Sequence, residues 1–280
     1  MVALDYSLQN NIAIISFYRF VNLPDFAEIR NPLKEFCATH NIKGTILLSH
    51  EGINGTISGE RADINAVLEY LNKDSRLNNL EYKENTAKYK PFGRIKVHLK
   101  KEIVRMGVEN LDATKNGEYV SAKDWDNLIE DEEVLVIDTR NDYEIMLGTF
   151  KNAISPNTKE FREFPKWANE NLNPKIHKKI AMFCTGGVRC EKSTAYLKSK
   201  GFEEVYHLKG GILQYLDDTQ NKNQKWQGEC FVFDERIAVN DKLEPSRNIL
   251  CKKCSSELTM DEIRWGLNNR GVVCSACKKG

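Results

Sequence analysis

Long apolar runs are absent from this 280-residue sequence, and so is an excess of charge of either sign. No run approaches the roughly 20 apolar residues that span a bilayer, and residues 1–11 lack the basic segment of a secretory signal. The sequence therefore predicts a chain without membrane spans, located in the cytoplasm. Its formal net charge is +1, so a nucleic-acid partner has to be bound by a local patch.

Several cofactor signatures are missing as well. The sequence has no two-histidine, one-carboxylate pattern for iron, no haem motif and no glycine fingerprint for a flavin or nicotinamide. Its eight cysteines include two CxxC pairs, which fits a reducing compartment better than a disulfide framework. A length of 280 residues allows about two domains and a small appendage.

The central motif is the segment 183–193, FCTGGVRCEKS. It follows an apolar run at 179–183, which predicts a buried strand, and precedes a helical pattern at 194–201 that ends in glycine. Cys184 is therefore expected at the carboxyl end of a strand. Ligands bind at this edge of an open α/β sheet.

The residues around Cys184 favour an ionised sulfur. Gly186 and Gly187 let backbone N–H groups turn toward an anion, and Arg189 adds positive charge. With the helix dipole, these groups predict a lowered pKa for Cys184 and a role as nucleophile, supported by Thr185 and Cys190 of the same loop. The alternative is an inert buried thiol.

The spacing of this loop narrows its chemistry. Four residues separate Cys184 from Arg189, giving C-x4-R, whereas cysteine phosphatases use the longer C-x5-R to hold a tetrahedral phosphate. The shorter loop resembles that of rhodaneses, in which the cysteine carries a single extra atom such as a persulfide sulfur. A second buried strand at 133–138 places Asp138 and Arg140 at the same sheet edge as Cys184. There they pair with each other, cap the next helix or join the site, and in rhodanese-like folds pairing and a site role can hold together.

The first part of the chain predicts a ferredoxin-like (acylphosphatase-like) domain over 1–108, an α+β fold. Its order is strand, helix, strand, strand, helix, strand, which is typical of a four-stranded antiparallel sheet covered by two helices. The expected strands cover 12–20, 43–49 and 56–59, with closing segments at 82–88 and 95–99, and the helices cover 24–40 and 62–73.

Two features of this domain have open interpretations. The turn at 50–55, HEGING, places His50 and Asn54 at a strand connection, either as capping groups or as functional ones. The stretch 81–105 interleaves basic and aromatic residues, including Lys90, Arg94 and Lys96. Such a stretch suits either RNA binding or a solvated strand face.

The rest of the chain predicts a parallel-sheet α/β domain over 119–220 and a small extension over 228–280. Residues 109–119 and 220–227 are polar and are expected to be linkers, and 230–234 with 237–239 is expected to form a hairpin. The extension contains CxxC-x19-CxxC, formed by Cys251, Cys254, Cys274 and Cys277. This spacing predicts a structural four-cysteine zinc site, with disulfides or free thiols as the alternative.

Several of these segments together resemble a known family. They are Asp138-Thr139-Arg140, FREFP at 161–165, the loop at 184–190, HLKGGI at 207–212 and HEGINGT at 50–56. This combination resembles the rhodanese-domain tRNA uridine hydroxylases over nearly the whole chain. The resemblance implies a central rhodanese-like domain, tRNA as partner, and oxygen-dependent conversion of the wobble uridine (U34) to 5-hydroxyuridine, with Cys184 as the essential loop cysteine.

One mechanism suits a single activated thiolate. Cys184 adds to C6 of uracil, C5 becomes electron-rich and captures oxygen, and the thiolate then leaves. Arg189, Arg140 or the loop N–H groups stabilise the developing charge. Two other functions stay open at this point: sulfur transfer through a Cys184 persulfide, with Cys190 and Cys230 as resolving thiols, and RNA binding with Cys184 as an oxidation sensor.

Overall fold

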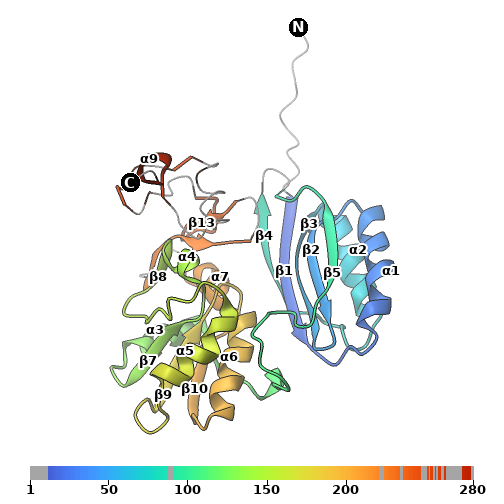
Figure 1. Cartoon of the computed structure of the whole chain (residues 1–280). Helices are drawn as coiled ribbons and strands as arrows, with labels where there is room; N and C mark the ends of the chain where they lie inside the picture. The colour runs from blue at the N-terminus through green and yellow to red at the C-terminus, as the bar shows by residue number, and fades with distance from the viewer. Residues whose placement is uncertain are drawn as a thin grey trace. The chain divides into compact units, whose positions relative to one another are not determined.

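The structure is a computed structural model that describes residues 12–87, 91–220, 224–233, 236–246, 251, 253, 254, 256, 258, 259, 262 and 273–278. The chain divides into two compact units, Met1–Val104 and Arg105–Gly280 (Figure 1). Each unit has a hydrophobic core of its own. In the described residues, no helix is both long and apolar enough to cross a membrane.

The first unit is a β-sheet with two helices on one face (Figure 1). Alternating apolar residues such as Ile15, Ile53 and Ile57 turn toward these helices and are fully buried, which fixes the face each strand presents. This arrangement confirms the predicted ferredoxin-like domain. Along the chain the elements are β1 (Ile12–Phe20), α1 (Phe26–Thr39), β2 (Lys43–Ser49), β3 (Gly52–Gly59), α2 (Arg61–Asn72), β4 (Tyr82–Ala87) and β5 (Ile95–Leu99).

The sheet of the first unit has five strands rather than the expected four. Its order is β4-β1-β3-β2-β5, and β5 pairs in parallel with β2, with Gly44 opposite Ile95. The chain crosses from β4 at one edge to β5 at the other, where Val97 enters the core. The fifth strand covers an edge of β2 that would otherwise expose unpaired backbone groups.

The second unit is built on a four-stranded parallel sheet of order β6-β10-β9-β7. Two pairs of helices pack together: α3 (Ala122–Glu130) with α7 (Gly211–Asp218), and α5 (Phe164–Asn171) with α6 (Val188–Ser199). Its first elements are η1 (Ala113–Lys115), β6 (Glu118–Val120), α3 (Ala122–Glu130), β7 (Val134–Asp138), α4 (Asp142–Ile145), β8 (Gly148–Phe150), η2 (Phe161–Glu163) and α5 (Phe164–Asn171). They are followed by β9 (Lys179–Phe183), α6 (Val188–Ser199), β10 (Glu204–Leu208) and α7 (Gly211–Asp218).

An aromatic cluster fills the core beneath the carboxyl end of this sheet. The ring of Phe150 meets Phe183, Tyr215 and Trp226 at centroid distances of 4.9, 4.8 and 5.3 Å, in edge-to-face geometry. Phe183 is the residue directly before Cys184, so this packing fixes the strand end that carries the loop.

The predicted C-terminal ends of both linkers are wrong, because the last residues of each lie in a strand. The first ends in β6, which pairs in parallel with β10, and the second ends in β11 (Trp226–Gly228), which pairs with β8. Trp226 is buried in the aromatic core, so residues beyond 220 complete the α/β unit instead of leaving it. The expected hairpin is confirmed as β12 (Cys230–Phe231) with β13 (Ala238–Val239). A final short helix, α9, covers Ser275–Lys278.

Candidate active site

The loop after β9 is closed around the sulfur of Cys184. Helix α6 begins at Val188, earlier than the predicted start at 194, so Arg189 and Cys190 lie in its first turn. Gly187 has φ +101° at the helix N-cap, a conformation that favours glycine, and its backbone N–H donates to Cys184 Sγ at 3.1 Å. The sulfur therefore lies at the positive end of a helix.

Electrostatics at Cys184 favour the thiolate despite burial. Burial alone raises the pKa of the thiol, but it is outweighed by the Cys190 thiol, the Arg189 guanidinium and the backbone N–H groups of the first helical turn. Together they lower the pKa of Cys184 to about 6. A pKa of this value favours the thiolate at neutral pH.

Arg189 is oriented by an acid that sequence reasoning missed. Its Nη1 and Nη2 atoms donate to Oε2 and Oε1 of Glu144 at 2.6 and 2.7 Å, a bidentate pair with both side chains buried. Thr185 Oγ1 lies 3.3 Å from Glu144 Oε1 and from Arg189 Nη2. Glu144 is the third residue after the Asn141 N-cap of α4, and its side chain accepts the backbone N–H of Asn141. That capping box was the available signal.

Asp138 and Arg140 pair with each other. Arg140 donates to both carboxylate oxygens of Asp138 at 2.9 and 2.6 Å and to the carbonyl of Gly148 at 2.5 Å, while its guanidinium lies 5.1 Å from the Trp226 ring centroid. Both side chains have no exposed surface. The donors of Arg140 therefore serve the core, and Arg189 is the arginine whose charge lowers the pKa of Cys184.

The second glycine pair, Gly210 and Gly211, packs directly against the loop that carries Cys184. The backbone N–H groups of Ile212 and Leu213 donate to the carbonyls of Cys184 and Thr185 at 3.0 and 3.1 Å. Gly211 has φ +69°, and a Cβ there would lie 2.4 Å from the Cys184 carbonyl oxygen. Gly211 is therefore required by a close approach of two backbones.

Cys184 has no exposed surface in this structure. A reaction partner would reach the sulfur only if the loop or the residues over it moved. There is open space beside Gly186 in this loop, because a Cβ built on it would meet no atom within 4 Å.

The C-terminal extension contacts the same site. Phe233 lies over Arg189, with 5.9 Å from guanidinium carbon to ring centroid, and its ring meets Phe231 edge-on at 5.0 Å. Phe231 in turn meets Tyr143 of α4 at 5.5 Å. Phe231 belongs to a small core that also contains Cys251 and Cys274, with Tyr143, Met146 and Leu147 packed against it.

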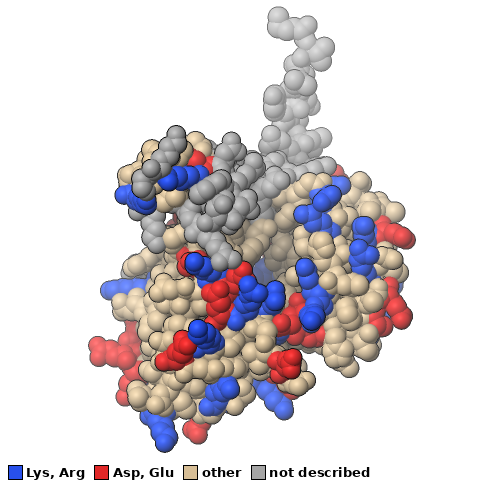
Figure 2. Space-filling model, in the orientation of Figure 1, with Lys and Arg blue, Asp and Glu red and all other residues tan. Residues whose placement is uncertain are grey.

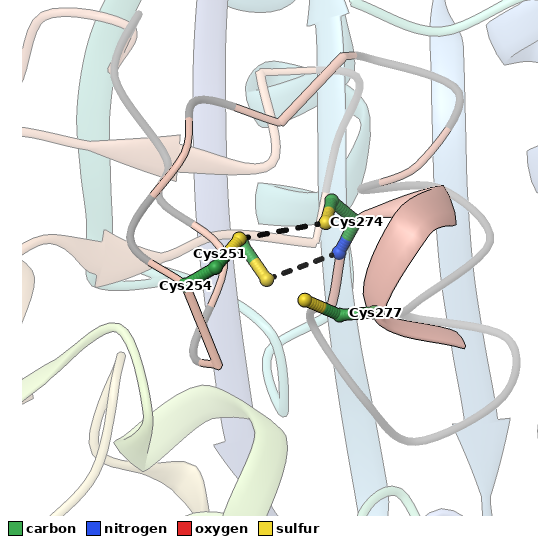
Figure 3. Close-up of side chains that lie close together, drawn as sticks. All are labelled: Cys251, Cys254, Cys274 and Cys277. Carbon is green, nitrogen blue, oxygen red and sulfur yellow. Dashed lines mark hydrogen bonds between the residues drawn. The ribbon is translucent and has the colours of Figure 1, made fainter. Parts of the chain in front are cut away.

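The four cysteines of the two CxxC pairs come together (Figure 3). Their sulfur atoms all lie within 4.8 Å of one another, and no disulfide joins them. Cys274 donates its backbone N–H to Cys251 Sγ at 3.2 Å. Four converging sulfurs are the donor set of a closed, tetrahedral metal site.

The candidate RNA-binding residues of the first unit do not form one cluster. Arg94 and Lys96 are exposed beside the start of β2, whereas His50 is exposed beyond its end. Asn54 donates its side-chain amide to the carbonyl of Ile103 at 2.9 Å, which ties down the chain after β5. Lys90 lies outside the described residues. On the side shown in Figure 2, basic and acidic side chains are intermixed.

The fold and the loop define a class: an acylphosphatase-like domain followed by a rhodanese-like domain. Two family models match accordingly, the UPF0176 acylphosphatase-like domain over residues 12–103 and the rhodanese-like domain over 121–218. Among solved structures, the rhodanese-like domain protein from Staphylococcus aureus is similar, with 25% identity, a TM-score of 0.30, and coverage of 35% of this chain and 90% of that one.

Curated relatives are similar over almost the whole chain. A tRNA uridine(34) hydroxylase from Wolbachia sp. subsp. Brugia malayi (strain TRS) is 52% identical over 267 residues, which is 95% of this chain and 98% of that protein. The protein of the same name from Wolbachia pipientis subsp. Culex pipiens (strain wPip) is 52% identical over 268 residues, covering 96% of this chain and 95% of that protein. The chain belongs to the tRNA uridine(34) hydroxylase family.

Proposed function

We propose that this protein hydroxylates C5 of uridine 34 in tRNA with molecular oxygen and that Cys184 is its nucleophile. The observation that supports this most directly is the thiolate of Cys184, stabilised by Gly187 N–H and by the Arg189 charge at a strand end. Family membership supports the substrate, because the relatives carry this activity in their names.

The chemistry starts from the electron pair on sulfur. Cys184 adds to C6 of uracil, which forms a C–S bond and moves an electron pair to C5. C5 then bonds to oxygen, and the adduct loses the C5 proton and expels the thiolate, leaving a hydroperoxy group on C5. Cleaving the O–O bond to leave the 5-hydroxyl group requires two further electrons and releases water.

Arg189 and the loop backbone have separate tasks in this scheme. Arg189, oriented by Glu144, stabilises the negative charge that develops near sulfur and on the pyrimidine carbonyl. The N–H groups of the loop stabilise the thiolate before attack and after expulsion. The loop carries out both tasks only once it has opened enough to admit the base, because Cys184 is buried.

We infer a structural zinc ion in the extension. The sulfurs of Cys251, Cys254, Cys274 and Cys277 would hold it with all four positions filled, so it would stabilise the fold of the extension rather than activate oxygen. For tRNA, Arg94 and Lys96 are the exposed cations that we assign to phosphate contacts, with Lys90 and His50 as further candidates and Asn54 as a residue that positions the segment after β5.

The test is nucleoside mass spectrometry of tRNA incubated with the protein, oxygen and a dithiol. The wild type is expected to produce 5-hydroxyuridine, and Cys184→Ser is expected to produce none. Full product from Cys184→Ser would rule out the mechanism. Cyanide turnover with thiosulfate, without 5-hydroxyuridine, would favour the sulfurtransferase alternative.

A further inference from the structure

Cys190 is a second nucleophilic group in contact with Cys184. It lies in the first turn of α6, its backbone N–H donates to the carbonyl of Gly187 at 2.9 Å, and its thiol lowers the pKa of Cys184. Neither cysteine has exposed surface. The scheme above gives Cys190 no task beyond stabilising its neighbour's charge.

Thr139 holds the Cys190 sulfur in this position. Its hydroxyl donates to the carbonyl of Phe183 at 2.9 Å and lies 3.7 Å from Cys190 Sγ. Because Phe183 precedes Cys184 directly, this contact ties the second sulfur to the strand end that carries the first. Cys230, another buried thiol of this unit, has its hydrogen bond to the carbonyl of Phe231 instead.

We propose that Cys184 and Cys190 form a redox pair, which supplies the two electrons of the hydroxylation by forming a disulfide and is reset by a dithiol reductant. The proposal rests on the proposed function above, whose reaction needs these electrons. The reductant is identified by its chemistry: a small or protein dithiol that undergoes thiol–disulfide exchange.

The electrons balance in three steps. The Cys184 thiolate attacks the terminal oxygen of the 5-hydroperoxy group; the O–O bond breaks, an S–O bond forms, and the nucleotide leaves as 5-hydroxyuridine while sulfur becomes a sulfenic acid. Cys190 then attacks that sulfur, an S–S bond forms, and the hydroxyl group leaves as water. A dithiol finally reduces the disulfide by exchange and leaves as its own disulfide.

The charges in the site favour this order of events. Burial, the hydrogen bond to Cys184 and the negative charge of that sulfur raise the pKa of Cys190, so Cys190 is a thiol while Cys184 is a thiolate. Conversion of Cys184 to a neutral sulfenic acid removes the negative charge. The positive charge of Arg189 and the contact with the Thr139 hydroxyl, which both lower the pKa of Cys190, remain. Cys190 thus becomes a better nucleophile once Cys184 is a sulfenic acid, which is the group that Cys190 attacks.

The experiment is a single turnover without reductant. Wild-type protein, reduced and then desalted, is mixed with tRNA and oxygen, and both the product and the cysteines are analysed by mass spectrometry. We expect no more than one 5-hydroxyuridine per chain, with a Cys184–Cys190 disulfide formed in equal amount. Product accompanied by two free, alkylatable thiols would overturn the proposal.

Cys190→Ser separates the redox role from hydrogen bonding, because serine keeps a donor but forms no disulfide. In the same experiment this variant is expected to make product and to leave Cys184 as a sulfenic acid, trapped by dimedone. If Cys184 stays a thiol, the proposal is wrong. The control is Cys37→Ala, which removes a buried thiol from α1 in the other unit and is expected to form the disulfide as the wild type does.

A measurement without tRNA keeps the two proposals distinguishable. One equivalent of hydrogen peroxide is expected to convert wild-type protein to the Cys184–Cys190 disulfide, whatever the nucleic-acid substrate. If no 5-hydroxyuridine forms even with dithiol present, the proposed function is wrong. The reaction with peroxide still shows whether Cys184 and Cys190 form a redox pair. Peroxide that oxidises Cys184 without engaging Cys190 would overturn the redox pair alone.

Discussion

Glu144 and Arg189 are joined by two parallel hydrogen bonds of 2.6 and 2.7 Å, with the Glu144 side chain fully buried and the Arg189 side chain 7% exposed. Burial acts against the charge on Glu144, yet the nearby guanidinium of Arg189 holds the pKa of this carboxyl below its usual range. The carboxylate therefore fixes the position of the positive charge that stabilises the Cys184 thiolate.

Removing this carboxylate should destabilise the fold. Glu144→Gln leaves a buried guanidinium without its counter-charge, which costs about 3–5 kcal/mol of unfolding free energy. The matched control is Glu170→Gln, which breaks an exposed pair with Lys166 at 3.9 Å and costs about 1 kcal/mol or less. Urea denaturation of both variants measures the difference. Equal losses of unfolding free energy would mean that the buried pair stabilises the fold no more than the exposed pair does.

The Cys184 thiolate should appear as the pH rises through about 6. Below that pH the sulfur is protonated, so the rate of 5-hydroxyuridine formation should fall as the pH drops from 7 to 5, whereas an ordinary cysteine ionises near 8.5. The difference in thiolate absorbance between wild type and Cys184→Ala gives the midpoint directly. A midpoint above about 8 would contradict the electrostatic account of the loop.

The catalytic loop could be predicted from sequence because its signals are local. A continuous apolar run gave the bounds of β9, and adjacent glycines marked the turn that follows. The capping box marks Glu144 only as a helix-capping residue, and its pairing with Arg189 could not be found this way, because Arg189 is 45 residues away in the chain. The strands β6 and β11 are only three residues long, too short to show an alternating pattern, so their existence depends on pairing with β10 and β8.

Gly211→Ala should disrupt the catalytic loop. The added Cβ would lie 2.4 Å from the Cys184 carbonyl oxygen and 2.8 Å from Gly187 N, at a φ of +69°. The control is Gly201→Ala, where φ is +88° but no atom lies within 4 Å of the Cβ, so it suffers only the backbone strain, about 1–2 kcal/mol. We expect Gly211→Ala to lose thiolate absorbance and activity, and Gly201→Ala to keep both. Retained activity in Gly211→Ala would show that the two backbones can separate without loss.

Replacing Arg94 and Lys96 should weaken tRNA binding. Each phosphate that a basic side chain no longer neutralises reduces the slope of log affinity against log salt by about 1, so Arg94→Ala with Lys96→Ala should reduce it by about 2. Lys73→Ala is the control, an exposed lysine at the C-terminal end of α2 on the helical face of the same unit. Melting temperatures should stay near the wild-type value in both variant proteins. An unchanged salt slope in the double variant would place the RNA elsewhere.

Loss of the metal should lower the activity, because the core of the extension contacts α4, the helix that carries Glu144. The core that contains Cys251 and Cys274 packs against Tyr143, which is the neighbour of Glu144 in that short helix. We expect one zinc ion per chain, released by a thiol-modifying agent and measured with a colorimetric chelator. Cys274→Ser should lose most of the metal and part of the hydroxylation rate, because the extension no longer supports the Glu144–Arg189 pair. Cys37→Ala, which removes a buried cysteine outside the cluster, should keep the full metal content. A metal-free Cys274→Ser protein with the wild-type rate would show that the extension and the catalytic loop are independent.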